Sequence, residues 1–371
     1  MSANSERAQI SSGAGTAREV RLSASGARVE GVQAPVVLAI DGNSLVHRSF
    51  HAQAHTAQPS WAVRGLLTQL VAAVDRIRPT AVIVGFDDAH RSVRRERWPR
   101  YKANRAEKLD TLVAQLTGAV EAMRELGVAV VVPDGLEADD VLASAAASSQ
   151  RAGATTVIVT SDRDAFALID DHTRVLRIIN GGVDASPLMT ADRLVTLLGV
   201  RASQYRDFAA LRGDPSDNLP GVRGIGPHHA ARLLSEFGSA VAAFDDLDSV
   251  RNRLGAAVAT RLAHPDARTA WELNCRVMAM RDDVPLDLDL ASGTGVLPLQ
   301  AEVVGAVFRA HNLTWSVNQA VRVLADVEQG EVRPPRAIVA PRVEGWPDGR
   351  SSRRPPKLAP RRPAAEQLSL F

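Results

Sequence analysis

The chain has 371 residues, of which 45% are hydrophobic and 23% charged, a composition typical of a globular protein with about two domains. A single cysteine, Cys275, excludes an intramolecular disulfide and a thiolate zinc cage, and we expect it to be a buried apolar side chain. The formal net charge of +2 argues against a uniformly basic nucleic-acid-binding protein. It conceals a split, because residues 332–363 carry nine basic and two acidic residues while residues 36–331 carry a net charge of −5.

The two ends of the chain differ in amino-acid composition from the middle. Residues 1–35 are rich in Ser, Ala and Gly and predict a disordered extension, without the apolar segment of a secretory signal. Residues 329–366 are rich in Pro and Arg and predict a flexible basic linker, followed by a short apolar segment at 367–371. No apolar run is long enough to span a bilayer, so we expect a cytoplasmic protein that does not bind membranes.

Alternating apolar runs and helical periodicities predict an α/β domain over residues 36–190. The predicted strands are 36–40, 81–86, 128–132, 155–159 and 174–179, and the predicted helices are 62–77, 109–126 and 138–152. Because helix-length segments separate the strands, the sheet should be parallel, with helices on both faces. Residues 191–328 have helical periodicity broken by glycine-rich turns, which predicts a second, all-helical region.

Carboxylates follow four of the predicted strands at the point where each ends. They are Asp41, Asp87, Glu137, Asp139, Asp140, Asp162 and Asp164. Any one of them alone could be a helix cap, but seven in one cleft would repel each other unless cations neutralised them. Oxygen ligands without His or Cys suit Mg²⁺ or Mn²⁺, and the number of acids favours two ions. Two such ions can activate water against a phosphate ester, so the pattern predicts a metal-dependent phosphoryl hydrolase.

Two further segments suit nucleic acid. Residues 91–108 hold eight basic and two acidic residues interleaved with Trp98 and Tyr101, as expected for contact with single strands. The glycine-rich residues 221–226 precede a predicted helix and resemble a helix-hairpin-helix, in which the backbone approaches a phosphate. A solvated helix face and a tight turn between packed helices are the structural alternatives for these two segments.

Taken together, these motifs resemble the 5′-nuclease or flap-endonuclease superfamily, specifically the 5′–3′ exonuclease domain of bacterial DNA polymerase I. The resembling segments, in the family's order, are 40–48, 86–87, Arg94 with 101–105, 137–140, 160–164 and 213–226. The resemblance implies a PIN-like parallel sheet flanked by helices, a helical arch at about 88–125 and a C-terminal helix-hairpin-helix region at 191–328. It also implies a stand-alone, monomeric, nucleoid-associated nuclease, since no polymerase domain follows.

The resemblance also assigns site residues. The metal set is the seven carboxylates above together with Asp214 and Asp217, and it would hold two Mg²⁺ or Mn²⁺ ions. The groups expected at the scissile phosphate are Arg94, Lys102 and Arg105. Further expected DNA contacts are Arg48, Tyr101, Asn104, Gly221, Val222, Gly224, Ile225 and Gly226, with a monovalent cation such as K⁺ at the hairpin carbonyls. The sequence departs from the family pattern at His47, Asp88, Ser161 and His228.

The implied activity is cleavage of DNA with 5′ flaps, nicks or RNA primers during replication and repair. The last residues resemble the short peptide that docks on the DNA polymerase sliding clamp, through Gln367, Leu368, Leu370 and Phe371. Two alternatives stay open at this point: a catalytically weak module that recognises branched DNA, and a PIN-type ribonuclease acting on free RNA.

Overall fold

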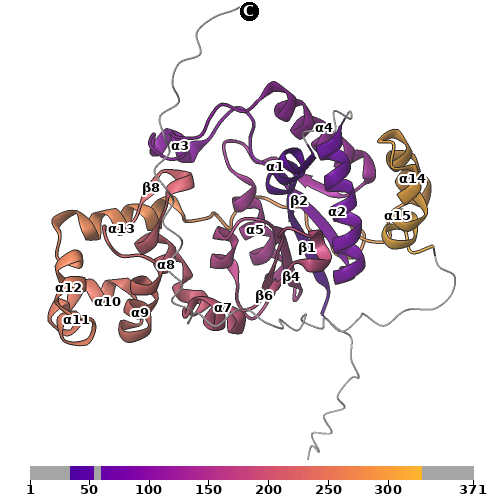
Figure 1. Cartoon of the computed structure of the whole chain (residues 1–371). Helices are drawn as coiled ribbons and strands as arrows, with labels where there is room; N and C mark the ends of the chain where they lie inside the picture. Colours follow the sequence, from indigo (N-terminus) through magenta and orange to yellow (C-terminus); the bar gives the residue numbers. More distant parts are fainter. Residues whose placement is uncertain (1–33, 54–59, 328–371) are drawn as a thin grey trace, which may run out of the picture. The chain divides into compact units, whose positions relative to one another are not determined.

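The computed structural model describes residues 34–53 and 60–327 (Figure 1). The expected basic linker at 329–366 and clamp-binding peptide at 367–371 lie outside the described residues, as does the expected N-terminal extension apart from Ala34 and Pro35. None of the described helices is both long and apolar enough to cross a membrane.

A six-stranded sheet in the order β3-β2-β1-β4-β5-β6 forms the centre of the α/β part (Figure 1). Its strands are β1 Val36–Asp41, β2 Ala81–Gly85, β3 Ala129–Val131, β4 Thr155–Thr160, β5 Thr173–Arg177 and β6 Leu188–Met189. The first five pair in parallel, which confirms the predicted strands and their direction. β6 pairs antiparallel with β5 and was not predicted, because two residues are too few to produce a periodic pattern.

Both faces of the sheet are buried, which is why its strands are continuous apolar runs. In β1, Leu38 and Ile40 join one core, whereas Val37 and Ala39 join the other. The first core is shared with α1 Gly42–Gln53, α2 Trp61–Ile77, α4 Asp110–Leu126 and α6 Gly182–Ala185. The second core is shared with α5 Ala138–Arg151, the 3₁₀ turn η2 Asp164–Leu168 and α7 Ala191–Leu198.

The expected arch region contains one short helix and most of a long one. α3 Val93–Arg97 has Ser92 as its N-cap, whose side chain accepts from the backbone N–H of Arg95. Residues 98–109 are not helical and lead into α4. We call residues 93–105 the arch root.

Residues 200–277 are mostly helical and include one small β-hairpin formed by β7 and β8. Their elements are η3 Ala202–Gln204, α8 Tyr205–Arg212, β7 Gly213–Asp214, η4 Pro215–Asp217, β8 Leu219–Pro220, α9 Pro227–Phe237, α10 Ala240–Asp245, α11 Leu247–Leu254, α12 Ala256–Leu262 and α13 Pro265–Val277. Cys275 on α13 is half-buried, and burial raises the pKa of its thiol to about 12. The thiol therefore stays protonated at neutral pH, as the apolar interpretation expected.

The last described helices return to the α/β part. α14 Ala301–Ala310, η5 Thr314–Ser316 and α15 Val317–Leu324 follow an irregular segment after α13. Val304 and Phe308 of α14 and Leu324 of α15 belong to the first core, and α15 contacts α2. This helical pair therefore covers the α/β domain, although it follows the helical region in the chain.

Candidate active site

The strand order creates a topological switch point between β1 and β4. From β1 the chain proceeds to β2 and β3 on one side, whereas β4 and β5 lie on the other. Open α/β sheets bind ligands in the crevice outside the carboxyl ends of the strands at such a point. Asp41 is the last residue of β1, and Asp162 lies two residues beyond β4. We call this edge, with its seven carboxylates (Asp41, Asp87, Glu137, Asp139, Asp140, Asp162 and Asp164), the acidic edge.

Asp41 is held in place by the two strands that flank the switch point. Its carboxylate accepts from the backbone N–H of Ser44 at 2.8 Å and from the Thr160 hydroxyl at 2.7 Å. The side chain is buried, and burial, followed by the charges of Asp87 and Asp162, raises its pKa to about 7. The structure therefore brings carboxylates that follow three different strands into one electrostatic neighbourhood.

The same crowding extends to the remaining acids. Burial raises the pKa of Asp164 to about 7, with further contributions from Asp162, Asp214 and Asp217. Burial also raises the pKa of Asp139, again helped by Asp162. Asp214 and Asp217, which follow Asp164 by 50 and 53 residues in the sequence, thus lie beside the acidic edge.

Asp87 ties three elements together at the end of β2. One oxygen accepts from the backbone N–H of Ala138, the first residue of α5, at 2.9 Å. The other accepts from the Asn43 side-chain amide at 2.6 Å, and the Oδ1 of Asn43 accepts from the Asp87 backbone N–H at 3.1 Å. Asp87 therefore caps α5, as the alternative interpretation expected, and also belongs to the acidic edge. Its bond to Ala138 fixes the start of α5, where Glu137 and Asp139 lie.

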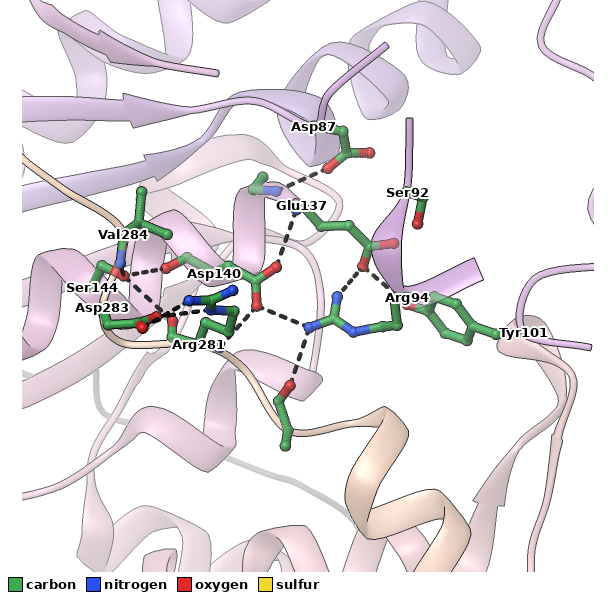
Figure 2. A network of polar contacts seen from close by, with 12 residues as sticks. Asp87, Ser92, Arg94, Tyr101, Glu137, Asp140, Ser144, Arg281, Asp283 and Val284 are labelled. Atoms are coloured by element: carbon green, nitrogen blue, oxygen red, sulfur yellow. Dashed lines mark hydrogen bonds and ion pairs between the residues drawn. The ribbon is translucent and has the colours of Figure 1, made fainter. Parts of the chain in front are cut away.

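Arg94 of the arch root contacts the acidic edge directly (Figure 2). The Arg94 guanidinium donates to Glu137 and Asp140, and Lys102 Nζ lies 3.2 Å from Glu137 Oε1. The Tyr101 hydroxyl donates to Glu137 Oε2 at 3.1 Å. Burial alone would raise the pKa of Glu137, but Lys102 and Arg94 outweigh burial and lower it. The pKa values of Arg94 and Lys102 are raised, because their carboxylate partners likewise outweigh burial.

The arch root is also docked on the loop around η4. The Asn104 amide donates to the Pro215 carbonyl at 2.9 Å, and reciprocally the Asn218 amide donates to the Arg100 carbonyl at 2.8 Å. Lys102 donates its backbone N–H to the backbone carbonyl of Asp217 at 2.9 Å and has a positive φ of 55°. Arg105 pairs with the Asp217 carboxylate. Tyr101 and Asn104, expected at DNA, are therefore hydrogen-bonded to other residues of the chain, Tyr101 in a buried position and Asn104 in an exposed one.

The donor set of the acidic edge fits a hard divalent ion, because it offers only carboxylate oxygens. Within residues 34–53 and 60–327, however, no three Asp, Glu, His or Cys side chains lie close enough to share one metal ion as they stand. Arg94 and Lys102 pair with Glu137 and Asp140 of this edge instead, and Arg105 pairs with the neighbouring Asp217. Metal binding therefore requires the carboxylates to turn towards one another and to exchange protein cations for ions.

The hairpin at 221–226 presents its backbone and buries its side chains. Val222 and Ile225 are 3% and 2% exposed and belong to the second core. Gly221 is required for packing, since a Cβ there would lie 2.3 Å from the Arg212 carbonyl oxygen. Gly226 caps α9, whose free N–H groups offer an anion site, and Gly224 has a positive φ of 80°. The Gly224 carbonyl accepts from Arg261 Nη1 at 3.0 Å, so a cation of the chain itself already lies at this hairpin.

Arg48 lies on α1 and reaches the segment after β5. Its guanidinium donates to the Asn180 amide oxygen at 2.8 Å on the surface. Burial lowers the pKa of Arg177 on β5, and the charges of Arg163 and Arg48 lower it further. Positive charge therefore gathers on this side of Asp162, and only Arg48 of these residues was predicted as a DNA contact.

The departures from the family pattern have local structural partners. Asp88 accepts from the Gly135 N–H at 2.7 Å, and the Ser161 hydroxyl lies 2.5 Å from that of Ser44. Burial lowers the pKa of His47 to about 4, with Lys108 as the next cause, so this side chain is neutral at pH 7. His228 is exposed near the start of α9. None of these four side chains pairs with a carboxylate of the acidic edge in the described part of the chain.

Several supporting residues were missed from the sequence. Asn43 and Thr160 lie in the segments 40–48 and 160–164 that resemble the family. Their closeness in sequence to Asp41 and Asp162 could therefore have identified them as supporting residues. Arg261 and Asn218 bond to backbone carbonyls far away in the chain, for which a single sequence carries no signal.

Known families match most of the described chain. Residues 36–198 match a model described as the 5′-3′ exonuclease N-terminal resolvase-like domain, and residues 200–299 match the 5′-3′ exonuclease C-terminal SAM fold. DNA polymerase I of Mycobacterium bovis is 37% identical over 235 residues, which are 62% of this chain and 26% of that protein. Thermostable DNA polymerase I of Thermus aquaticus is 37% identical over 260 residues, 69% of this chain and 30% of that protein. The chain thus spans less than a third of the length of these relatives.

Solved structures share the fold at low sequence identity. T5 5′-exonuclease, solved with divalent metal ions (zinc), has a TM-score of 0.54 and 18% identity, covering 77% of this chain and 99% of that one. The catalytic core of Rad2 in complex with DNA substrate has a TM-score of 0.52 and 16% identity, covering 79% and 92%. With two adjoining domain models that match residues 36–299 almost without a gap, the chain belongs to the 5′-3′ exonuclease family.

Proposed function

We propose that this chain is a structure-specific 5′–3′ exonuclease and flap endonuclease that uses two Mg²⁺ or Mn²⁺ ions. The observation that carries the proposal is the convergence of carboxylates from four strand exits and from the η4 loop, beside three arch-root cations. Like charges gather in this way where cations and a polyanionic substrate are bound. Its substrates would be DNA with 5′ flaps, nicks or RNA primers.

In this proposal carboxylates of the acidic edge and of the η4 loop hold the ions, and Arg94, Lys102 and Arg105 hold the phosphate. Two divalent ions supply an activated water and stabilise charge on the phosphate oxygens. Lys102 and Arg94 both contact Glu137. A phosphate bound next to that carboxylate would therefore lie within reach of both cations. Fixed cations of this kind stabilise developing negative charge without having to reorganise.

The hairpin and the start of α9 would bind the backbone of the duplex. Backbone N–H groups and a helix N-terminus bind phosphate without reading sequence, which suits an enzyme that recognises structure. Arg261 adds positive charge there by bonding the Gly224 carbonyl. A K⁺ ion at the hairpin would have to share or replace this contact.

The test is cleavage of a labelled 5′-flap duplex and of single-stranded RNA by the full chain, with Mg²⁺, Mn²⁺ or EDTA. We expect cutting near the flap junction with either ion and none with EDTA. Binding of the flap without metal-dependent cutting would instead identify a branched-DNA-binding module. Preferential cutting of the free RNA would identify a PIN-type ribonuclease.

We further propose that residues 367–371 dock on the DNA polymerase sliding clamp, with Leu368, Leu370 and Phe371 in an apolar pocket and Gln367 setting the register. A tether through residues 329–366 would then raise the local concentration of nuclease at DNA that carries a clamp, in the bacterial cytoplasm. Deleting 367–371 should abolish clamp binding in a pull-down and leave cutting of free flaps intact. Clamp affinity that survives the deletion would contradict this assignment.

A further inference from the structure

Asp140 differs from its neighbours at the acidic edge because two backbone N–H groups, as well as an arginine, donate to its side chain (Figure 2). One oxygen accepts from Arg94 Nη2 and from the backbone N–H of Arg281, both at 2.8 Å. The other accepts from the backbone N–H of Glu137 at 3.1 Å. The side chain is 1% exposed. Three of its roughly four acceptor positions are therefore filled before any ion arrives.

The segment 278–284, which we call the strap, leaves the helical region directly after α13 and passes over α5. Ser144, one turn after Asp140 and fully buried, accepts from the Val284 N–H at 3.0 Å. Its hydroxyl lies 2.7 Å from the Asp140 carbonyl and 3.3 Å from the Arg281 carbonyl and donates to these oxygens. Asp140 and Ser144 together fasten the strap to α5.

Arg94 uses its two terminal nitrogens differently. Nη1 donates to Glu137, whereas Nη2 donates to Asp140 and to the Ala279 carbonyl of the strap at 3.1 Å. If Glu137 turns to an ion, Nη1 is released and Nη2 stays anchored. The freed end of a planar, rigid guanidinium would then point at the phosphate that follows the ion into the site.

We propose that Asp140 is a positioning residue and not a metal ligand, and that it fixes Arg94 of the arch root against the strap. This inference rests on the proposed nuclease function. Asp140 would thereby link the helical region to Arg94, the phosphate-binding cation. The strap continues α13, and Val277 of α13 packs on Tyr101 and Leu219.

The first test is a Mn²⁺ titration of the full chain by calorimetry, together with kcat and KM on a 5′ flap. We expect Asp140→Asn to bind as many ions as the unchanged protein, while kcat falls about ten- to a hundredfold, as for groups that orient a site from behind. The matched variant Asp139→Asn, one residue earlier, should lose an ion. Loss of an ion in Asp140→Asn would overturn the inference. An unchanged protein that binds no Mn²⁺ and cuts nothing would instead defeat the proposed function.

A second variant tests the same inference if Asp140→Asn does not fold. Ser144→Ala removes the strap contact and touches no carboxylate, and Ser148→Ala, one turn farther along α5, is its control. We expect Ser144→Ala to lower kcat about tenfold with the ion number unchanged. It should add little to the effect of Arg94→Ala, because Ser144 acts through Arg94 and linked residues are not additive. Full kcat in Ser144→Ala, or an additive double variant, would contradict the coupling.

Discussion

The acidic edge and the hairpin at 221–226 use their side chains in opposite ways. At the acidic edge the binding groups are side-chain carboxylates, and burial with mutual repulsion raises the pKa values of Asp41 and Asp164 to about 7. At the hairpin the side chains of Val222 and Ile225 are in the core, and the backbone carries the binding groups. The rest of the fold thus holds the acids of the first region close together, which destabilises their charged forms. The second region contributes to the stability of the fold.

This contrast gives opposite expectations for substitutions. Removing the charge of Asp41 or Asp164 should abolish activity and make the metal-free protein more stable. Removing an apolar group at the hairpin should lower stability first, and DNA binding only through the altered backbone.

The largest expected effect is on catalysis. Asp162→Asn combined with Asp164→Asn should lower cleavage of a 5′ flap at least about a thousandfold, because the ions that activate water lose their ligands. Flap binding, measured by fluorescence anisotropy in Ca²⁺, should persist because the hairpin is intact. Cleavage within tenfold of the unchanged protein would remove these acids from the metal site.

At the hairpin, Ile225→Ala should lower the free energy of unfolding by about 3 kcal/mol, because a buried side chain leaves a cavity. Urea denaturation followed by circular dichroism measures this change. The exposed Val241 on α10 offers a matched control, since Val241→Ala removes apolar atoms that are already in contact with water. Equal effects of the two changes would contradict the core role of the hairpin.

A smaller effect is expected at Arg261. Arg261→Ala removes the guanidinium at the Gly224 carbonyl and should weaken duplex binding about threefold to tenfold, with a shallower dependence on salt, because one phosphate-attracting charge is lost. Cleavage rate at saturating substrate should be unchanged. Arg251→Ala on α11 provides a charge-matched control. An unaltered salt dependence would exclude Arg261 from the duplex interface.

The pH dependence of stability should distinguish the acidic edge as well. A carboxyl whose folded-state pKa is raised from 3.8 to about 7 stabilises the fold below pH 3.8, and this contribution is lost as pH rises to about 7. The Tm of the metal-free chain should therefore fall between pH 4 and pH 7 because of Asp41 and Asp164. In Asp164→Asn the fall should be smaller, and an identical slope in both proteins would contradict the assigned pKa.

The sequence alone predicted the five parallel strands and the gathering of acids at one edge, because apolar runs and strand exits are local patterns. It did not predict β6, since Leu188–Met189 is too short, nor the return of α14 and α15 to the first core. The assignments of Tyr101 and Asn104 to DNA and of Asp140 to metal stay predictions. The sequence did not reveal the partners that the structure gives these residues, Glu137, Pro215 and Arg281, because these are contacts between distant segments.

The most direct test of this account is the free energy of unfolding of the full chain as a function of Mn²⁺ concentration at pH 8, compared with Asp164→Asn. Without metal, the variant should be the more stable protein, because one buried charge is gone. At saturating Mn²⁺ the order should reverse, because ions that bind only the folded state stabilise the protein that keeps its ligands. A variant that is less stable without metal, or that gains as much from Mn²⁺, would contradict the acidic edge as a metal site.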